Sequence, residues 1–97
     1  MSYKIIVKPE ASIDIIDIKK WYRAKKTGLE KDFTNELKIN ITLIKQNPLL
    51  FQLRYNIFRA AILNRFPYLV YYSFENDIVY IHAVLAAKQD QQRNLTK

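Results

Sequence analysis

The segment YLVYYSFENDIVYIHAVL, residues 68–85, decides the fold of this chain. Both of its halves are rich in Val, Ile and Tyr, which are residue types that favour β-strands. Between the halves lies Glu75-Asn76-Asp77, and Asn-Asp suits the tight turn of a hairpin. The segment therefore predicts two antiparallel strands, over residues 68–74 and 78–85.

A third run with strand-forming residues precedes this hairpin, over residues 57–63. Only Asn64-Arg65-Phe66-Pro67 separates it from the next strand. Three sequential strands with short connections form an antiparallel meander. In the connection, Pro67 shapes the turn, and we expect Phe66 and Tyr68 to anchor the start of the next strand in the core.

Before Pro48 the apolar residues follow a helical period instead. They form two stripes, one of Ala11, Ile15, Ile18 and Tyr22 and one of Leu29, Phe33, Leu37, Ile41 and Ile44. These stripes predict helices over residues 9–25 and 29–47, with Gly28 as a left-handed cap in the link. So short a link makes the two helices pack as an antiparallel hairpin.

The remaining element is a short strand over residues 3–8, which ends at Pro9. The order β-α-α-β-β-β indicates an α+β fold, in which the helical hairpin packs on one face of a mainly antiparallel twisted sheet. The first strand must pair with one of the other three, and the pattern leaves open which one. We expect one domain over residues 1–88 and a polar tail over residues 89–97.

Composition excludes several classes of site. The 97 residues include no cysteine, one histidine and one glycine. Disulfide scaffolds, thiolate zinc sites, cysteine nucleophiles and multi-histidine metal sites are therefore excluded, as are glycine-rich phosphate loops. We expect no cofactor.

Sixteen basic residues against nine acidic ones give a formal net charge of +7. Such a balance favours an acidic partner, either a nucleic acid or an acidic protein surface. The longest run without Asp, Glu, Lys or Arg, residues 78–87, is too short to cross a bilayer, and the N-terminus does not look like a signal peptide. We therefore expect a cytoplasmic protein without a membrane partner.

With these elements in order, the chain resembles the RelE/ParE superfamily of bacterial type II toxins over roughly residues 3–88. The resemblance rests on Ala11-x-x-Asp14-Ile15, Trp21-Tyr22, Gly28-Leu29, Phe33-x-x-x-Leu37, Asn47-Pro48-x-x-Phe51, Arg59, Arg65-Phe66-Pro67-Tyr68, Val70-Tyr71-Tyr72 and Ile78-x-x-Ile81-x-Ala83-Val84. It implies the same fold, a toxin–antitoxin module of the plasmid-stabilisation type, and a cognate antitoxin protein that wraps and neutralises the toxin.

The C-terminal run departs from the family pattern, which often has a histidine two residues after Ala-Val and then an arginine and a proline. Here Ala86 stands in the place of the histidine, Lys88 or Gln89 stands near that of the arginine, and no tyrosine follows Tyr80. In RelE-type members this region supplies groups for mRNA cleavage on the ribosome, so that set is incomplete here. ParE-like members, which poison DNA gyrase, do not depend on it.

The resemblance therefore predicts a ParE-like toxin that binds and blocks a large target, DNA gyrase or the ribosome. One alternative is a ribosome-dependent mRNA endonuclease of RelE type. Another is a degenerate, non-toxic member that only binds its partner.

Four residues are candidates for RNA chemistry: Arg59, Arg65, His82 and Lys88. A guanidinium could clamp a phosphate, and a lone histidine could act as a general acid or base. Each also has a bland interpretation. Arg59 could pair with an antitoxin or keep its strand soluble, and Arg65 could face a partner. His82, expected on one strand face with Tyr80 and Val84, could be half-buried with a backbone partner.

The residues predicted to bind a partner are Lys19, Lys20, Trp21, Arg23, Lys25, Lys26, Arg59 and Arg65. Most of them cluster at the end of the first helix, where cations also suit the helix dipole. The cluster could guide the chain toward rRNA, an indirect nucleic-acid contact, or toward an acidic protein. Four tyrosines could stack on bases, although strands favour tyrosine for packing: Tyr68, Tyr71, Tyr72 and Tyr80.

Overall fold

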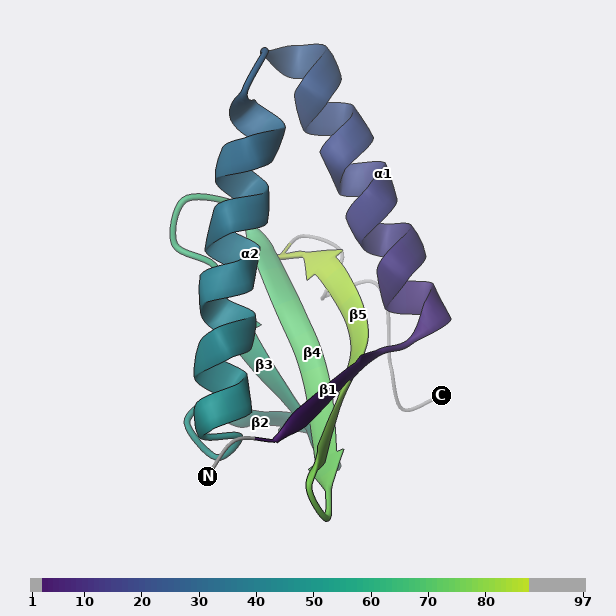
Figure 1. The fold of residues 1–97 in the computed structure, drawn as a ribbon, viewed down its shortest axis with the longest axis vertical. Coiled ribbons are helices and arrows are strands. Elements are labelled where there is room, and N and C mark those ends of the chain that lie inside the picture. Colours follow the sequence, from purple (N-terminus) through teal and green to yellow (C-terminus); the bar gives the residue numbers. More distant parts are fainter. Residues whose placement is uncertain (1–2, 88–97) are drawn as a thin grey trace.

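A computed structural model describes residues 3–87, which form two layers (Figure 1). The elements are β1 (Lys4–Val7), α1 (Pro9–Lys25), α2 (Leu29–Gln46), β2 (Leu53–Tyr55), β3 (Phe58–Ile62), β4 (Tyr68–Glu75) and β5 (Ile78–Ala86). Figure 1 shows the two helices joined at the top and spreading apart over one face of the sheet. This arrangement confirms the predicted α+β fold. Neither helix in the described part of the chain is long and apolar enough to cross a membrane.

The strands form one five-stranded sheet in the order β1-β5-β4-β3-β2. The strands β3, β4 and β5 make the predicted antiparallel meander. The first strand, whose neighbour the sequence leaves open, lies parallel to β5, with Lys4 opposite Ile78 and Val7 opposite Ile81. The helical hairpin connects β1, at one edge of the sheet, to β2, at the other edge.

The strand β2 is a fifth strand that the sequence pattern does not predict. Leu53 lies opposite Arg59 and Tyr55 opposite Phe58, with an irregular step between the two pairs. A three-residue strand is too short to show the alternation by which strands are recognised. Ile57, predicted to begin the next strand, instead lies in the turn between β2 and β3.

The main core lies between the helices and the sheet and uses both predicted stripes. Its helical members are Ala11, Ile18 and Tyr22 from α1 and Phe33, Leu37 and Ile44 from α2. The rings of Tyr22 and Phe33 contact each other and those of Phe66 and Tyr68, with centroids 5.0 to 6.2 Å apart. Such pairs stabilise beyond their buried area. Phe66 and Tyr68 thus anchor the start of β4, as predicted.

A second, smaller cluster lies on the face of the sheet away from the helices, which we call the far face. Its buried members are Ala60, Leu69, Tyr71, Ala83 and Leu85. Tyr71 belongs to this cluster and Tyr72 to the main core, so the two point to opposite faces as predicted. Both side chains are fully buried. Neither ring is therefore open to stacking on a base.

The strand β5 carries a β-bulge at His82. Tyr71 lies opposite Ala83 and Tyr72 opposite Ile81, so that His82 has no partner residue on β4. The extra residue shifts the alternation of side chains by one. Val84 therefore packs in the main core, whereas His82 lies on the far face. The prediction that these two residues share a face is wrong for this reason.

Candidate functional site

Arg59 lies on β3 with its side chain on the helix side of the sheet. Its Nη1 donates a 2.7 Å hydrogen bond to the carbonyl of Phe51, and its guanidinium lies 5.9 Å from the centre of the Phe74 ring. On the neighbouring strand, the hydroxyl of Tyr72 donates to the carbonyl of Pro48 at 2.5 Å. These two bonds attach the segment between α2 and β2 to the sheet. Arg59 thus has a structural role that neither sequence interpretation included.

His82, the bulge residue, lies among far-face side chains. Its Nε2 is 2.7 Å from the hydroxyl oxygen of Ser73 on β4, and the ring of Phe58 packs edge-on at 4.8 Å. The partner of His82 is therefore a serine side chain and not the backbone group that the sequence led us to expect. Burial lowers the pKa of His82, the charge of Lys8 lowers it further, and Glu10 acts in the opposite direction. The imidazole is neutral at pH 7 and could accept a proton.

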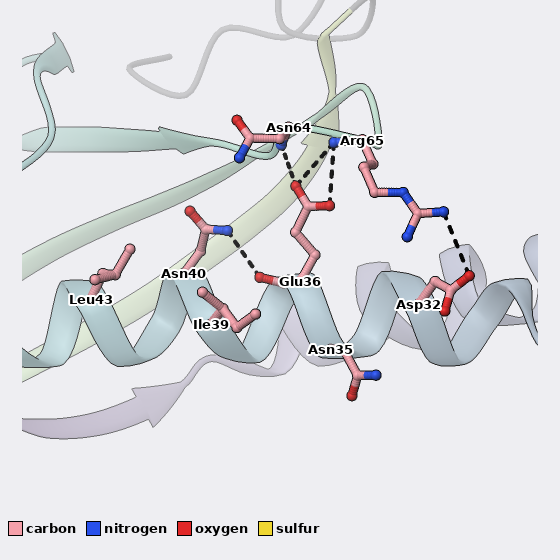
Figure 2. Close-up of a pocket in the computed structure, with 8 residues that line it drawn as sticks. All are labelled: Asp32, Asn35, Glu36, Ile39, Asn40, Leu43, Asn64 and Arg65. Carbon is pink, nitrogen blue, oxygen red and sulfur yellow. Dashed lines mark hydrogen bonds and ion pairs between the residues drawn. The ribbon is translucent and has the colours of Figure 1, made fainter.

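Arg65 lies in the connection between β3 and β4, which is held against α2 (Figure 2). The backbone N–H groups of Asn64 and Arg65 both donate to the carboxylate of Glu36, at 3.1 Å from Arg65. The Arg65 guanidinium is 3.6 Å from the carboxylate of Asp32, one turn earlier on α2. Hydrogen bonds to a charged acceptor are stronger than neutral ones. The connection is therefore fixed to the helix, while the side chain of Arg65 stays mostly exposed.

A pocket of about 380 Å³ lies between this connection and α2. Figure 2 shows its lining residues: Asp32, Asn35, Glu36, Ile39, Asn40, Leu43, Asn64 and Arg65. Its apolar part comes from Leu43 and from Ile39, which is 61% exposed. The buried amide of Asn40 donates a 2.9 Å hydrogen bond to the backbone carbonyl of Glu36. The pocket thus combines an exposed apolar pair with a wall fixed by hydrogen bonds.

A second pocket, of about 340 Å³, adjoins the first at Asn35. It is lined by Lys19, Glu30, Lys31, Thr34, Asn35 and Lys38. The lysines of this pocket come from α1 (Lys19), from the first turn of α2 (Lys31) and from the position just before Ile39 (Lys38). We call the residues that line these two pockets the α2 surface.

The predicted basic cluster gathers where the two helices meet. Lys20, Trp21, Arg23, Lys25 and Lys26 are exposed, and Lys19 is partly exposed. Trp21 is 54% exposed, although its ring packs against Tyr22 at 5.2 Å and against the Lys25 ammonium at 4.6 Å. Arg23 forms a two-point ion pair with Glu30, at 2.7 and 2.6 Å, which ties α1 to α2. This arginine has a structural partner, whereas Trp21 is presented to solvent.

The candidates for RNA chemistry do not converge. Arg59 points to the helix side of the sheet, His82 to the far face, and Arg65 lies beside α2. Lys88 and the polar tail, residues 89–97, lie outside the described residues. A general base acts only within hydrogen-bond reach of its proton. Within residues 3–87 there is also no group of three or more His, Asp or Glu placed to hold a metal ion.

Two residues that fix the geometry of these candidate sites, Glu36 and Ser73, are not predicted from the sequence. Glu36 is one of many charged residues on its helix, and its partners are backbone groups 28 and 29 residues further along the chain. Ser73 reads as a small polar residue within a strand, and its contact with His82 depends on the bulge. No local pattern signals either contact.

The chain has relatives among known proteins. Residues 5–91 match the family described as the ParE toxin of type II toxin–antitoxin system, parDE. No curated protein sequence matches the chain. Among solved structures, it is similar to a chain of the chromosomal ParDE TA system from P. aeruginosa, with a TM-score of 0.72 and 14% identity, covering 88% of this chain and 96% of that one.

A second solved relative is a chain of the E. coli DinJ-YafQ toxin-antitoxin complex, with a TM-score of 0.62 and 18% identity, covering 91% of this chain and 96% of that one. At such identities the two structures show a shared fold. The family match is the stronger finding, because it extends over nearly the whole chain, from β1 to beyond β5. This chain belongs to the ParE toxin family of type II toxin–antitoxin systems.

Proposed function

We propose that this toxin acts in the cytoplasm by binding and blocking a large target such as DNA gyrase, and that a cognate antitoxin neutralises it. The separation of Arg59, His82 and Arg65 carries the proposal, because dispersed groups suit recognition better than the cleavage of one bond. The exposed cations around Trp21 offer an aromatic anchor within a positive surface. Such a surface fits an acidic partner.

The antitoxin is expected to be acidic where it touches the toxin, because the toxin carries a formal charge of +7. Both solved relatives come from toxin–antitoxin systems, one named ParDE and the other DinJ-YafQ. An acidic helix or an added strand is a common way to cover such a surface. The pair would form a module of the plasmid-stabilisation type.

A ribosome-dependent mRNA endonuclease is the second candidate, and one observation favours it. His82 holds a neutral imidazole 2.7 Å from the hydroxyl oxygen of Ser73, which suits the movement of a proton. RNA cleavage would also need a cation at the phosphate. Lys8, whose charge acts on His82, is one cation on this side of the sheet.

Controlled expression of this chain alone tests both candidates, with gyrase supercoiling and mRNA integrity measured after induction. We expect growth arrest, lost supercoiling or trapped DNA breaks, and intact mRNA. Codon-spaced cuts, mapped by primer extension and abolished by His82→Asn, would instead establish the endonuclease. Normal growth with a stable antitoxin complex would indicate a degenerate binding member.

The part of the surface that meets the target is tested with the purified chain in a supercoiling assay. We expect Trp21→Ala to weaken inhibition at least about tenfold, as is usual for an aromatic anchor. The matched control is Ile13→Ala on the same helix, because Ile13 is 60% exposed. Equal inhibition by both variants would contradict a role for Trp21.

A further inference from the structure

We propose that the antitoxin binds to the α2 surface. An acidic amphipathic helix would lie along α2, with an apolar side chain over Ile39 and Leu43 and carboxylates against Lys31 and Lys38. The inference rests on the toxin–antitoxin pairing proposed above and names the part of the toxin to which the antitoxin binds.

The apolar part of the α2 surface has the form of an anchor site. Ile39 and Leu43 are four residues apart, so they lie one above the other on the same side of the helix. Beside them is the pocket of about 380 Å³. An exposed isoleucine next to a hollow of this size can be covered by one inserted side chain, and such contacts dominate the affinity of interfaces.

The wall of this pocket is held in place before any partner arrives. Glu36 accepts the backbone N–H groups of Asn64 and Arg65, and Asn40 bonds to the carbonyl of Glu36 (Figure 2). A surface that is already ordered loses little conformational freedom on binding. The pocket therefore offers its contacts at a small entropic cost.

The charges of the α2 surface select an acidic partner. Its three carboxylates already have partners inside the toxin, since Glu36 holds the connection, Asp32 pairs with Arg65, and Glu30 pairs with Arg23. Lys31 and Lys38 are exposed, and neither forms an ion pair within residues 3–87, although the charge of Lys31 acts on Glu30. An approaching molecule therefore meets exposed lysines beside the apolar side chains of Ile39 and Leu43.

This combination favours a protein over a nucleic acid. A phosphate backbone would use the lysines but would bury Ile39 and Leu43 against charged oxygens. Lys31, Asn35, Lys38, Ile39 and Leu43 follow one another along the exposed side of α2. The first and the last of these residues are twelve positions apart, which is about 18 Å of helix. A partner helix of about three turns, laid along α2, covers this length.

The test measures the affinity of the antitoxin encoded beside this chain's gene for four toxin variants, by isothermal titration calorimetry. We expect Ile39→Glu and Lys38→Glu each to weaken binding at least about tenfold. The matched control is Ile13→Glu on α1, since Ile13 is 60% exposed and Ile39 is 61% exposed. Its affinity should stay within about twofold of the wild type. Circular dichroism shows that each variant is folded.

The fourth variant, Ile62→Glu, tests a rival surface. Ile62 is 62% exposed on β3 and lines a pocket of about 300 Å³ with Leu50 and Phe51. If this variant alone weakens binding, the antitoxin lies on the far side of the molecule and the inference is overturned. A wild-type complex that neither Ile39→Glu nor Lys38→Glu weakens also overturns it, and leaves the proposed function intact. If the antitoxin forms no complex with the wild-type chain, both the inference and the proposed function are overturned.

Discussion

Tyr71 and Tyr72 are neighbours on β4, and only one of their buried hydroxyl groups has a hydrogen-bond partner among the described residues. The Tyr72 hydroxyl donates to the carbonyl of Pro48, whereas that of Tyr71 is buried without a partner. We expect Tyr72→Phe to lower the free energy of unfolding by about 1–2 kcal/mol, because it leaves a buried carbonyl unpaired. Tyr71→Phe should be neutral or stabilising. Urea denaturation of both variants checks this, and equal losses would contradict it.

His82 makes stability depend on pH in a predictable direction. Its pKa is lowered by burial, so the unfolded chain binds a proton more readily than the folded one. The stabilisation from a neutral His82 is therefore fully present above pH 6.5, the ordinary value, and is lost as pH falls through the lower pKa of the folded state. We expect the urea midpoint to fall between pH 7.5 and pH 5.5, and to fall less in His82→Gln. An identical pH profile in that variant would refute this assignment.

At the scale of elements, the link between α1 and α2 depends on one left-handed residue. Gly28 has a φ of 89°, and a Cβ placed there would meet no atom within 4 Å. Gly28→Ala should therefore cost about 1 kcal/mol through backbone strain alone, since there is nothing for the methyl group to strike. Gly28→Asn should cost less, because asparagine tolerates this conformation better. Thermal denaturation of the two variants measures the difference, and equal melting temperatures would contradict the strain argument.

The elements that the sequence predicts are those whose signals are local. Both helices carry long apolar stripes, and the turn at Asn76-Asp77 marks the β4–β5 hairpin. The strand β2 and the bulge at His82 depend on pairing with other strands, which no short window contains. The parallel place of β1 beside β5 is likewise a long-range choice.

The candidate residues divide in the same way. The exposure of Trp21 follows from its place off the apolar stripe of α1, so the sequence could indicate it. The partners of Arg59 and Arg65 could not be inferred, because a backbone carbonyl of a loop and a carboxylate of α2 meet them only in the folded chain. The sequence thus predicted which residues were candidates better than it predicted what they contact.

At the scale of the whole molecule, the net charge and the close surface contacts affect different rates of partner binding. The net charge of +7 acts over a Debye length, about 8 Å at physiological salt, whereas the contacts at Ile39 act only on touching. Long-range attraction governs the rate of association, and close contacts govern the rate of dissociation.

We therefore expect the association rate with the antitoxin to fall about tenfold or more as salt rises from 50 to 500 mM, while the dissociation rate changes little. Lys38→Gln should lower the association rate, and Ile39→Ala should mainly raise the dissociation rate. Surface plasmon resonance at several salt concentrations measures both rates. A salt-independent association rate would mean that the positive charge does not steer this encounter, and the expected acidity of the antitoxin would lose its physical basis.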